Sequence, residues 1–339
     1  MTDQVLRVGV VGAGSWGTAL ARILADRGHD VEIWAREPEV VKEILDYREN
    51  RTFLPGADLP ESLRASGDLE AVVRGKSLVV SVVPSQFVSQ VMGEAAGYLE
   101  PSAQVVSASK GIEVSTGRRM DEVLSGLLTP EQAHALTFLS GPSFAKEVCQ
   151  EAPTAVVVAS RSEEAARRAQ MAFQTGYFRV YTNDDVLGVE LGGALKNVIA
   201  LAAGAVAGLG FGHNTLAALI TRGLAEITRL GVAMGADPAT FSGLAGMGDL
   251  VLTCTGALSR NRTVGFRLGK GESLDQVLQD MRGVAEGVKT VQAVRRLAGK
   301  HGVEMPISEE VHALLWEGRT PTEAVQNLML REPKPEVWS

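Results

Sequence analysis

A glycine-rich turn near the start of the chain restricts its fold more than any other sequence feature. The apolar run Leu6–Val11 has the length of a buried strand, and it leads directly into Gly12-Ala13-Gly14-Ser15-Trp16-Gly17. Residues 19–24 then carry apolar side chains at helical spacing. A Gly-x-Gly-x-x-Gly motif between a strand and a helix predicts a βαβ unit that binds a dinucleotide at the N-terminus of its helix.

Each glycine of this motif has its own expected role. Gly12 makes the tight turn, Gly14 lets a pyrophosphate approach the backbone, and Gly17 packs the helix against the sheet. The N–H groups and the positive end of the helix dipole would then face the phosphates. A tight strand-to-helix crossover that binds nothing is the alternative explanation of the same motif.

The end of the second expected strand bears on the choice of dinucleotide. The strand Val31–Ala35 is followed by Arg36, at the position where an NAD-specific site places an acid on the ribose hydroxyls. An arginine there can pair with a 2′-phosphate, so we interpret it as tolerance of NADP or preference for it. An ordinary solvated arginine at a strand end is the alternative, and the nearby acids Glu32 and Glu37 leave room for NAD.

Composition sets the outer limits of the function. A chain of 339 residues is too long for one typical core and predicts two domains. Its 45% hydrophobic and 22% charged residues are typical of soluble globular proteins. The net charge of −7 disfavours nucleic acid and anionic membranes as partners. It permits a phosphorylated small molecule, because a local basic pocket can override a mild overall charge.

The cysteines, the N-terminal segment and the apolar stretches favour a cytoplasmic protein without a membrane span or a metal site. Cys149 and Cys254 show neither pairing nor metal-ligand spacing, which indicates packing roles in a reducing compartment. The short segment Met1–Gln4 has no character of a signal peptide. The longest apolar stretch, Val198–Phe211, is too short and too rich in glycine and alanine to span a bilayer.

Strand-like and helical segments alternate in the first half of the chain, and only helical patterns follow Asp185. This predicts an α/β Rossmann-type dinucleotide-binding domain, residues 1–187, followed by an all-α C-terminal domain, residues 188–339. The further expected strands are Ser77–Val83, Gln104–Ala108, Thr137–Leu139, Thr154–Ala159 and Phe178–Tyr181. The expected helices of the second half are Val186–Ala207, Asn214–Met234, Pro238–Leu244, Ser273–Met281, Thr290–Ala298, Ile307–Trp316 and Pro321–Leu330.

The helical half carries one lysine in an otherwise apolar helical segment. One side of this segment carries Glu190, Gly193, Lys196, Asn197 and Ala200, at spacings of three and four residues. A desolvated lysine loses its proton readily enough to act as a base. A lysine that extends to solvent at a domain edge is the alternative.

Three other polar stretches have both a functional and an ordinary explanation. Gly246–Leu250 sets Asp249 in a glycine-rich turn, and an Asx-turn or a helix cap is the alternative. Ser259-Arg260-Asn261-Arg262 offers donors that suit a phosphate, although such a run is also common at solvated helix starts. Phe87, in the segment Pro84–Phe87 just after a strand, flanks a cofactor ring or fills the core.

Together these motifs give the chain a resemblance, from Val8 to about Leu330, to the bacterial NAD(P)-dependent type of glycerol-3-phosphate dehydrogenase. This resemblance implies the interconversion of dihydroxyacetone phosphate and sn-glycerol 3-phosphate with NADP(H), NAD(H) or both, and a supply of glycerol 3-phosphate for phospholipid synthesis. The most specific stretches are Gly12–Gly17, Val83–Phe87, Ser109-Lys110-Gly111, Gly141–Ala145, Gly193–Asn214, Leu244–Cys254 and Ser259–Arg262.

The resemblance also implies site residues, with Lys196 as the general acid/base. The chain departs from the common pattern of this family at Ala207 and His213, where relatives often carry an acid. The implied substrate contacts are Lys110, Gly141, Ser143, Lys196, Asp249, Ser259, Arg260 and Asn261. The implied cofactor contacts are Gly12, Gly14, Ser15, Trp16, Gly17, Arg36, Phe87, Lys110, Ala145, Arg260, Val284 and Glu286.

The chemistry of a ketone reduction suits these residues. Lys196 can deliver the proton, Lys110 can stabilise charge on the oxygen, and two close lysines each make the other easier to deprotonate. The expected partners are the small phosphorylated substrate and a second copy of the chain in a homodimer. Two other functions stay open: a reductase of the β-hydroxyacid or ketopantoate type, and a dinucleotide sensor without turnover.

Overall fold

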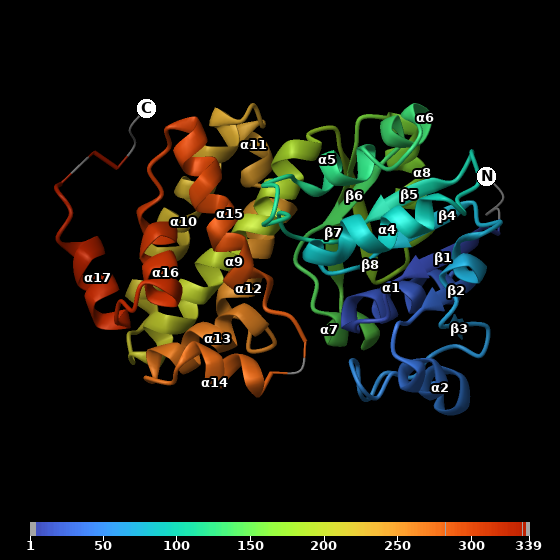
Figure 1. The fold of residues 1–339 in the computed structure, drawn as a ribbon, viewed down its shortest axis with the longest axis horizontal. Helices are drawn as coiled ribbons and strands as arrows, with labels where there is room; N and C mark the ends of the chain where they lie inside the picture. The colour runs from blue at the N-terminus through green and yellow to red at the C-terminus, as the bar shows by residue number, and fades with distance from the viewer. Residues whose placement is uncertain (1–4, 282, 334, 337–339) are drawn as a thin grey trace.

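The computed structural model describes residues 5–281, 283–333 and 335–336, in two parts that lie side by side along the long axis (Figure 1). The first part is a sheet covered by helices, and the second consists of helices. The strands are β1 (Arg7–Val11), β2 (Asp30–Trp34), β3 (Arg64–Ser66), β4 (Leu78–Ser81), β5 (Gln104–Ser107), β6 (Thr137–Ser140), β7 (Thr154–Ser160) and β8 (Phe178–Asn183).

The sheet has eight strands in the order β3-β2-β1-β4-β5-β6-β7-β8, and neighbours are parallel except for the antiparallel pair β6 and β7. The strand order reverses direction between β1 and β4, so a topological switch point lies at the carboxyl ends of these two strands. Ligands of open α/β sheets bind in the crevice at such a point. The fold therefore places the glycine-rich turn after β1 where a dinucleotide binds.

Helices cover both faces of the sheet, which explains its almost continuous apolar strands. In β1, Val8 and Val10 belong to one buried cluster and Val11 belongs to a second cluster on the other face. The covering helices are α1 (Ser15–Asp26), α2 (Pro38–Tyr47), α3 (Leu69–Val73), α4 (Val88–Ala96), α5 (Met120–Ser125), α6 (Pro130–His134), α7 (Ala145–Cys149) and α8 (Glu163–Phe173), with a 3-10 turn η1 (Ser85–Phe87) before α4.

The helical part is built around α9 (Val186–Gly208), which is buried along nearly its whole length. Around it lie α10 (His213–Ala233), α11 (Pro238–Phe241), the π-helical turn η2 (Leu244–Gly248), α12 (Asp249–Thr255), α13 (Arg260–Gly269), α14 (Leu274–Gln279), α15 (Glu286–His301), α16 (Pro306–Trp316) and α17 (Pro321–Met329). Among the described residues, no strand follows β8, as the sequence predicts.

The length argument against a membrane span is wrong for α9. This helix starts at Val186, before the apolar stretch that the sequence suggests, and its 23 residues are long and apolar enough to cross a membrane by length and composition. In the structure, 83% of its most apolar window is buried inside the protein. The apolar character of α9 is therefore explained by its place at the centre of the helical core.

Glycines on α9 and α13 let the two helix backbones approach closely. Gly204 and Gly208 of α9 face Gly265 and Gly269 of α13, and a Cβ at Gly265 would overlap the carbonyl oxygen of Leu201. Small residues at matching positions remove the side chains that otherwise separate helices by 8–10 Å. This contact accounts for part of the high glycine content, and it fixes α13 against the helix that carries Lys196.

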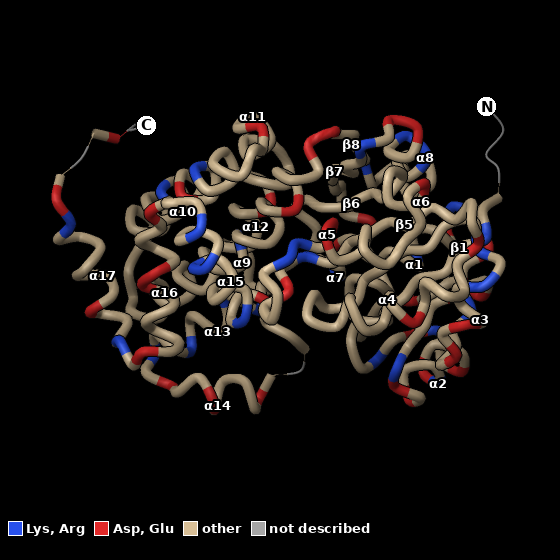
Figure 2. The backbone as a smooth tube through the Cα atoms, turned by 45° about the horizontal axis from the view of Figure 1, so that its top comes forward, with Lys and Arg blue, Asp and Glu red and all other residues tan. Residues whose placement is uncertain are grey.

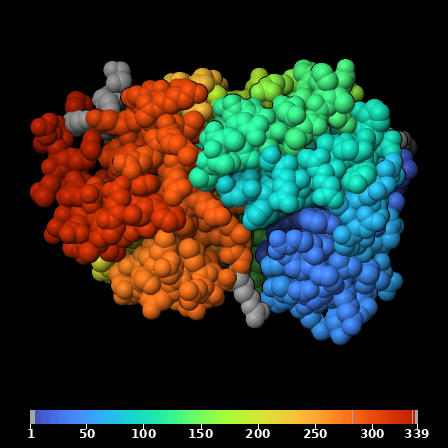
Figure 3. All heavy atoms as spheres, in the orientation of Figure 1, coloured from blue at the N-terminus to red at the C-terminus, as the bar shows by residue number. Residues whose placement is uncertain are grey.

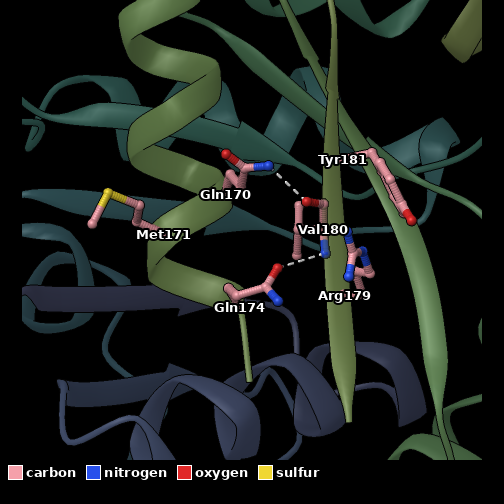
Figure 4. Close-up of a pocket in the computed structure, with 6 residues that line it drawn as sticks. All are labelled: Gln170, Met171, Gln174, Arg179, Val180 and Tyr181. Atoms are coloured by element: carbon pink, nitrogen blue, oxygen red, sulfur yellow. Dashed lines mark hydrogen bonds between the residues drawn. The ribbon is translucent and has the colours of Figure 1, made fainter. Parts of the chain in front are cut away.

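The sheet edge formed by β8 is bonded to two glutamines, Gln170 of α8 and Gln174, which directly follows this helix (Figure 4). Gln170 Nε2 donates to the carbonyl oxygen of Val180 at 2.7 Å, and the Val180 amide donates to Gln174 Oε1 at 2.9 Å. Both backbone groups of Val180 are thus bonded to side chains on the side away from β7. Arg179 and Tyr181 flank them, and the arginine lies over the tyrosine ring at 5.1 Å.

Charges of both signs are mixed along the described chain (Figure 2). Basic and acidic positions alternate over both parts of the molecule in this view. Many of them form ion pairs, such as Arg74 with Glu70 at 2.7 Å and Arg64 with Asp30 at 2.8 Å.

Candidate active site at the carboxyl edge of the sheet

The turn after β1 forms a cradle with one open side. Gly12 has a φ of +117°, and a Cβ there would lie 2.9 Å from the carbonyl oxygen of Val82. A Cβ at Gly17 would overlap the Gly12 carbonyl oxygen, whereas nothing lies within 4 Å of a Cβ built at Gly14. Gly14 caps α1 without a side-chain hydrogen bond, and the first turn of α1 has no acid. This open, uncapped helix N-terminus fits a pyrophosphate.

Asn50 holds this turn in place by hydrogen bonds, and the sequence analysis did not identify Asn50. Its Nδ2 donates to the Ala13 carbonyl oxygen and to Thr18 Oγ1, both at 2.8 Å. The Ser15 hydroxyl donates to the Phe53 carbonyl oxygen at 2.5 Å, so the loop after α2 holds the turn from outside. Asn50 is fully buried, but an asparagine in a loop with turn chemistry gives no sequence signal of this role.

The two other predicted cofactor positions near this turn differ in exposure. Trp16 is half-buried, and its ring lies 6.4 Å from that of Phe178. Arg36 follows β2, and its exposed guanidinium pairs with Glu37 at 2.8 Å. Glu32 is bound to Lys76 at 2.8 Å, so the acid that approaches Arg36 is Glu37. Arg36 thus stands at the expected place with its charge partly neutralised.

The segment after β4 links the sheet to the helical part. Ser85 of η1 donates to the Glu286 carboxylate at the start of α15, from its hydroxyl at 2.6 Å and from its amide at 3.2 Å. Burial raises the pKa of Glu286, against these two hydrogen bonds. Phe87 and Val284 are 42% and 37% exposed, so Phe87 does not fill the core. The predicted cofactor contact Glu286 therefore engages Ser85 in this structure.

A compact charged array lies between the two parts of the molecule. Lys196 of α9 contacts Asp249 Oδ1, and Lys110, which follows β5, donates to Asp249 Oδ2 at 2.7 Å. Lys196 also donates to Thr253 Oγ1 at 3.0 Å, and Lys110 to the Gly141 carbonyl oxygen at 3.3 Å. Three residues that the sequence points to separately are thus in direct contact.

The local structure around Asp249 corrects the expected glycine-rich turn. Residues Leu244–Gly248 form the π-helical turn η2, and Asp249 is the first residue of α12. Thr253 lies four residues further, on the same side of α12 as Asp249. Sequence reasoning missed Thr253, although its spacing from Asp249 was a usable signal. Single-turn π-helical segments are frequent at functional sites.

Burial and neighbouring charges shift the pKa values of Lys196 and Asp249. Burial lowers the pKa of Lys196 to about 8, although the Asp249 carboxylate opposes the shift and Lys110 adds to it. Burial would raise the pKa of Asp249, but Lys110 and Lys196 together hold it below its usual value. The array therefore holds one carboxylate between two amines, and one of these amines titrates near neutral pH.

The predicted phosphate contacts surround the start of α13. Ser259 caps α13 through a hydrogen bond from the Arg262 amide at 3.2 Å. Asn261 donates to Asn197 Oδ1 at 3.0 Å and accepts from the Gly287 amide at 2.9 Å, so it joins α9, α13 and α15. The Arg260 side chain is exposed. Arg260 is therefore the member of this group with an accessible cationic side chain.

The loop after β6 brings the remaining predicted residues to the same edge. Ser143 donates to the Gly141 carbonyl oxygen at 3.0 Å, and that oxygen also accepts from Lys110. Ala145 is the first residue of α7 and is half-buried.

On the face seen in Figure 3, a notch separates the blue N-terminal atoms from the orange atoms of the helical part.

The cradle at the switch point and the two lysines that share Asp249 are features of an NAD(P)-dependent oxidoreductase that acts on a CH–OH group. Two family models match the chain: the N-terminus of NAD-dependent glycerol-3-phosphate dehydrogenase over residues 7–166, and its C-terminus over residues 185–326. The chain belongs to the glycerol-3-phosphate dehydrogenase family.

Individual relatives agree with the family models over almost the whole chain. Glycerol-3-phosphate dehydrogenase (NAD(P)+) of Citrifermentans bemidjiense is 59% identical over 97% of this chain and 98% of its own length. The crystal structure of glycerol-3-phosphate dehydrogenase from Coxiella burnetii is 39% identical, with a TM-score of 0.92 over 96% of this chain and 99% of that one. A 2-dehydropantoate 2-reductase from Geobacter metallireducens shares the fold alone, at 14% identity and a TM-score of 0.61 over 93% of this chain and 100% of that one.

Proposed function

We propose that this protein reduces dihydroxyacetone phosphate to sn-glycerol 3-phosphate, reversibly, with NADPH or NADH. We further propose that it supplies glycerol 3-phosphate for glycerophospholipid synthesis in the cytoplasm, as a homodimer. The observation that carries the proposal is the contact of Lys196 and Lys110 with the two oxygens of Asp249. The family membership supports the choice of substrate.

The lysine pair has the properties of a proton donor for a ketone. A bound nicotinamide would supply the hydride. Lys196 is buried, and Asp249 and Thr253 fix its ammonium group in one direction. Its lowered pKa makes the proton easy to release to an oxygen that gains negative charge. Lys110 stays beside this oxygen as a cation and stabilises the charge.

Arg260 and the start of α13 supply the phosphate site in this proposal. The first backbone N–H groups of α13 and the exposed Arg260 guanidinium offer charge-assisted donors. Asn261 keeps α13 in register with Lys196, through its hydrogen bond to Asn197 on the same helix. The binding energy of the phosphate would thus hold the carbonyl carbon in place near Lys196.

We also propose residues 1–187 and 188–339 as the two domains. β8 ends at Asn183 and α9 begins at Val186, so this boundary lies in the first turn of α9. The unusual residues Ala207 and His213 lie at the end of α9 and the start of α10. Neither makes a hydrogen bond to the lysine array among the described residues, so we expect them to affect packing and not chemistry.

The experiment that tests the function follows the nicotinamide absorbance in three parallel assays. NADPH or NADH is combined with dihydroxyacetone phosphate, with 2-dehydropantoate, or with no second substrate. Rapid oxidation with dihydroxyacetone phosphate alone supports the proposal. Faster oxidation with the keto acid would identify a reductase of the ketopantoate type, and binding without oxidation in every assay would identify a dinucleotide sensor.

A further inference from the structure

Behind the lysine array lies a small polar cavity between the ends of β5 and β6 and helix α9. Its volume is about 10 Å³, at the lower limit for one ordered water molecule. Three polar atoms of its lining are buried without a hydrogen-bond partner among the described residues: Ser107 Oγ, Ser140 Oγ and Glu190 Oε2. Buried polar atoms that lack a protein partner commonly bind an ordered water.

Glu190 is the ionisable residue of this cavity that the proposed chemistry does not use. Its Oε1 accepts a hydrogen bond from the Asp121 amide at 3.0 Å. The Asp121 carboxylate lies between Arg119, at 3.0 Å, and Arg161, at 2.9 Å. Burial raises the pKa of Glu190 well above its usual value, and the nearby Asp121 charge adds to this shift. The raised pKa favours the protonated form of Glu190, and in that form its unpartnered oxygen can donate a hydrogen bond into the cavity.

Lys110 forms another part of the cavity wall. Its side chain passes Gly193 of α9, where a Cβ would lie 3.7 Å from both Lys110 Cγ and Cδ and 2.9 Å from Ser140 Oγ. The lysine stem is thus packed between α9 and the end of β6, and its ammonium group reaches Asp249. A change in the occupancy of the cavity would therefore change the packing around the Lys110 side chain.

We propose that Glu190 is a positioning residue, which binds one ordered water molecule together with Ser107 and Ser140 and so supports Lys110 beside Asp249. This inference rests on the roles proposed above for Lys110 and Lys196. It extends the site one layer further into the protein, to residues that touch neither the substrate nor the cofactor.

The kinetic test compares Glu190→Gln with Glu190→Leu. Glutamine keeps an acceptor for the Asp121 amide and a donor for the water, whereas leucine keeps similar volume and loses both. We expect near-normal kinetics for Glu190→Gln. We expect Glu190→Leu to lower kcat/KM for dihydroxyacetone phosphate about tenfold or more, because a small displacement of a reacting group costs that much.

The pH profile separates positioning from a general loss of stability. Lys110 lowers the pKa of Lys196. If Glu190→Leu displaces Lys110, the pKa of Lys196 should rise, and the alkaline decrease in kcat/KM should move to higher pH. A variant that is only less stable should keep the wild-type pH profile. The inference is wrong if both variants keep the wild-type limb and wild-type kcat/KM, or if Glu190→Gln is as impaired as Glu190→Leu.

A crystal structure tests the water independently of activity. We expect density for one water within hydrogen-bond distance of Glu190 and both serines, and its loss in the double variant Ser107→Ala/Ser140→Ala. Ser81→Ala is the matched control, because Ser81 Oγ is also buried and finds no hydrogen-bond partner in the described part of the chain, but does not line this cavity. A dry cavity in the wild type would overturn the inference, whereas failure of the proposed function would appear as absent turnover in the wild-type assay.

Discussion

Lys110 and Lys196 hold opposite oxygens of one carboxylate, that of Asp249, although the first lysine follows a strand of the sheet and the second lies within the longest helix. Two cations share one anion here, so the array retains a net positive charge when both lysines are protonated. Such a site attracts an anionic substrate and stabilises negative charge that forms on a reacting oxygen.

Replacement of Lys196 by alanine should remove most of the turnover and leave cofactor binding almost unchanged. General acid catalysis contributes typically 10²–10⁴-fold, so we expect kcat to fall by about this factor. Steady-state assays with dihydroxyacetone phosphate give kcat, and fluorescence titration with NADPH gives the Kd. Lys300→Ala, at an exposed position in the last turn of α15, is the control. Near-normal kcat in Lys196→Ala would refute the assigned role.

The reaction should depend on pH with opposite signs in its two directions. The pKa of Lys196 is lowered to about 8 by burial. Ketone reduction needs the protonated lysine, so kcat/KM should fall as the pH rises through about 8. Alcohol oxidation needs the neutral lysine, so its kcat/KM should rise over the same range. Profiles of kcat/KM from pH 6 to pH 10 check this for both reactions. A kcat/KM that rises, or falls, with pH in both directions would contradict the prediction.

Arg260→Ala should weaken binding of the phosphorylated substrate specifically. Loss of a charge-assisted hydrogen bond costs roughly 1.5–3 kcal/mol, which corresponds to an increase in KM of about ten- to a hundredfold. Dihydroxyacetone lacks the phosphate, so its KM should change much less. Equal losses on both substrates would mean that Arg260 serves the cofactor or the fold instead.

Two substitutions at the end of β2 should move the cofactor preference in opposite directions. Arg36→Asp replaces an attraction to a 2′-phosphate by a repulsion, so the ratio of kcat/KM for NADPH over NADH should fall. Glu37→Gln removes the carboxylate that pairs with Arg36, so the same ratio should rise. Both effects should shrink at high salt, because the two side chains are near the surface. An unchanged ratio in both variants would leave Arg36 as a solvated residue without a cofactor role.

A buried acid in the helical part should make the stability of the protein depend on pH. Glu226 of α10 is 2% exposed and accepts hydrogen bonds from the Ile307 and Ser308 amides, at 2.7 and 3.3 Å, at the start of α16. Burial raises its pKa to about 7, so between pH 4.5 and 7 the folded state binds more protons than the unfolded state. Its contribution to the free energy of unfolding should therefore decrease by up to about 3 kcal/mol as the pH rises across this range.

Urea unfolding of Glu226→Gln at several pH values measures this contribution. The variant stays neutral, so its stability relative to the wild type should increase from pH 4.5 to pH 7. Glu94→Gln, at an exposed position in α4, should show no such trend. Parallel stability curves for the wild type and Glu226→Gln would contradict the prediction.

The sequence predicts seven of the eight strands, because these segments are rich in β-branched, aromatic or other apolar residues. It does not predict β3, because Arg64–Ser66 has three residues and just one buried apolar side chain. The helices α3, α5, α6 and α7 were missed for a similar reason, since five or six residues do not establish a helical period. The longer helices α4, α12 and α13 were also missed.

The components of the candidate site could be predicted, but their contacts could not. Lys110, Lys196 and Asp249 are visible as polar residues in unusual settings, and family resemblance joins them. Their meeting depends on the packing of α12 against α9, which local sequence patterns do not specify. Thr253 and Asn50 escaped notice because their hydrogen bonds in the site join residues that are distant in the sequence.

The glutamines that cover β8 also restrict how copies of this protein can assemble. An uncovered edge strand recruits another strand and lets a sheet continue from one molecule into the next. At Val180 both backbone groups are already bonded to Gln170 and Gln174, so a neighbouring chain would first have to displace two side chains. Replacement of both glutamines should free the two backbone groups of Val180 to pair with a strand of another molecule at this edge.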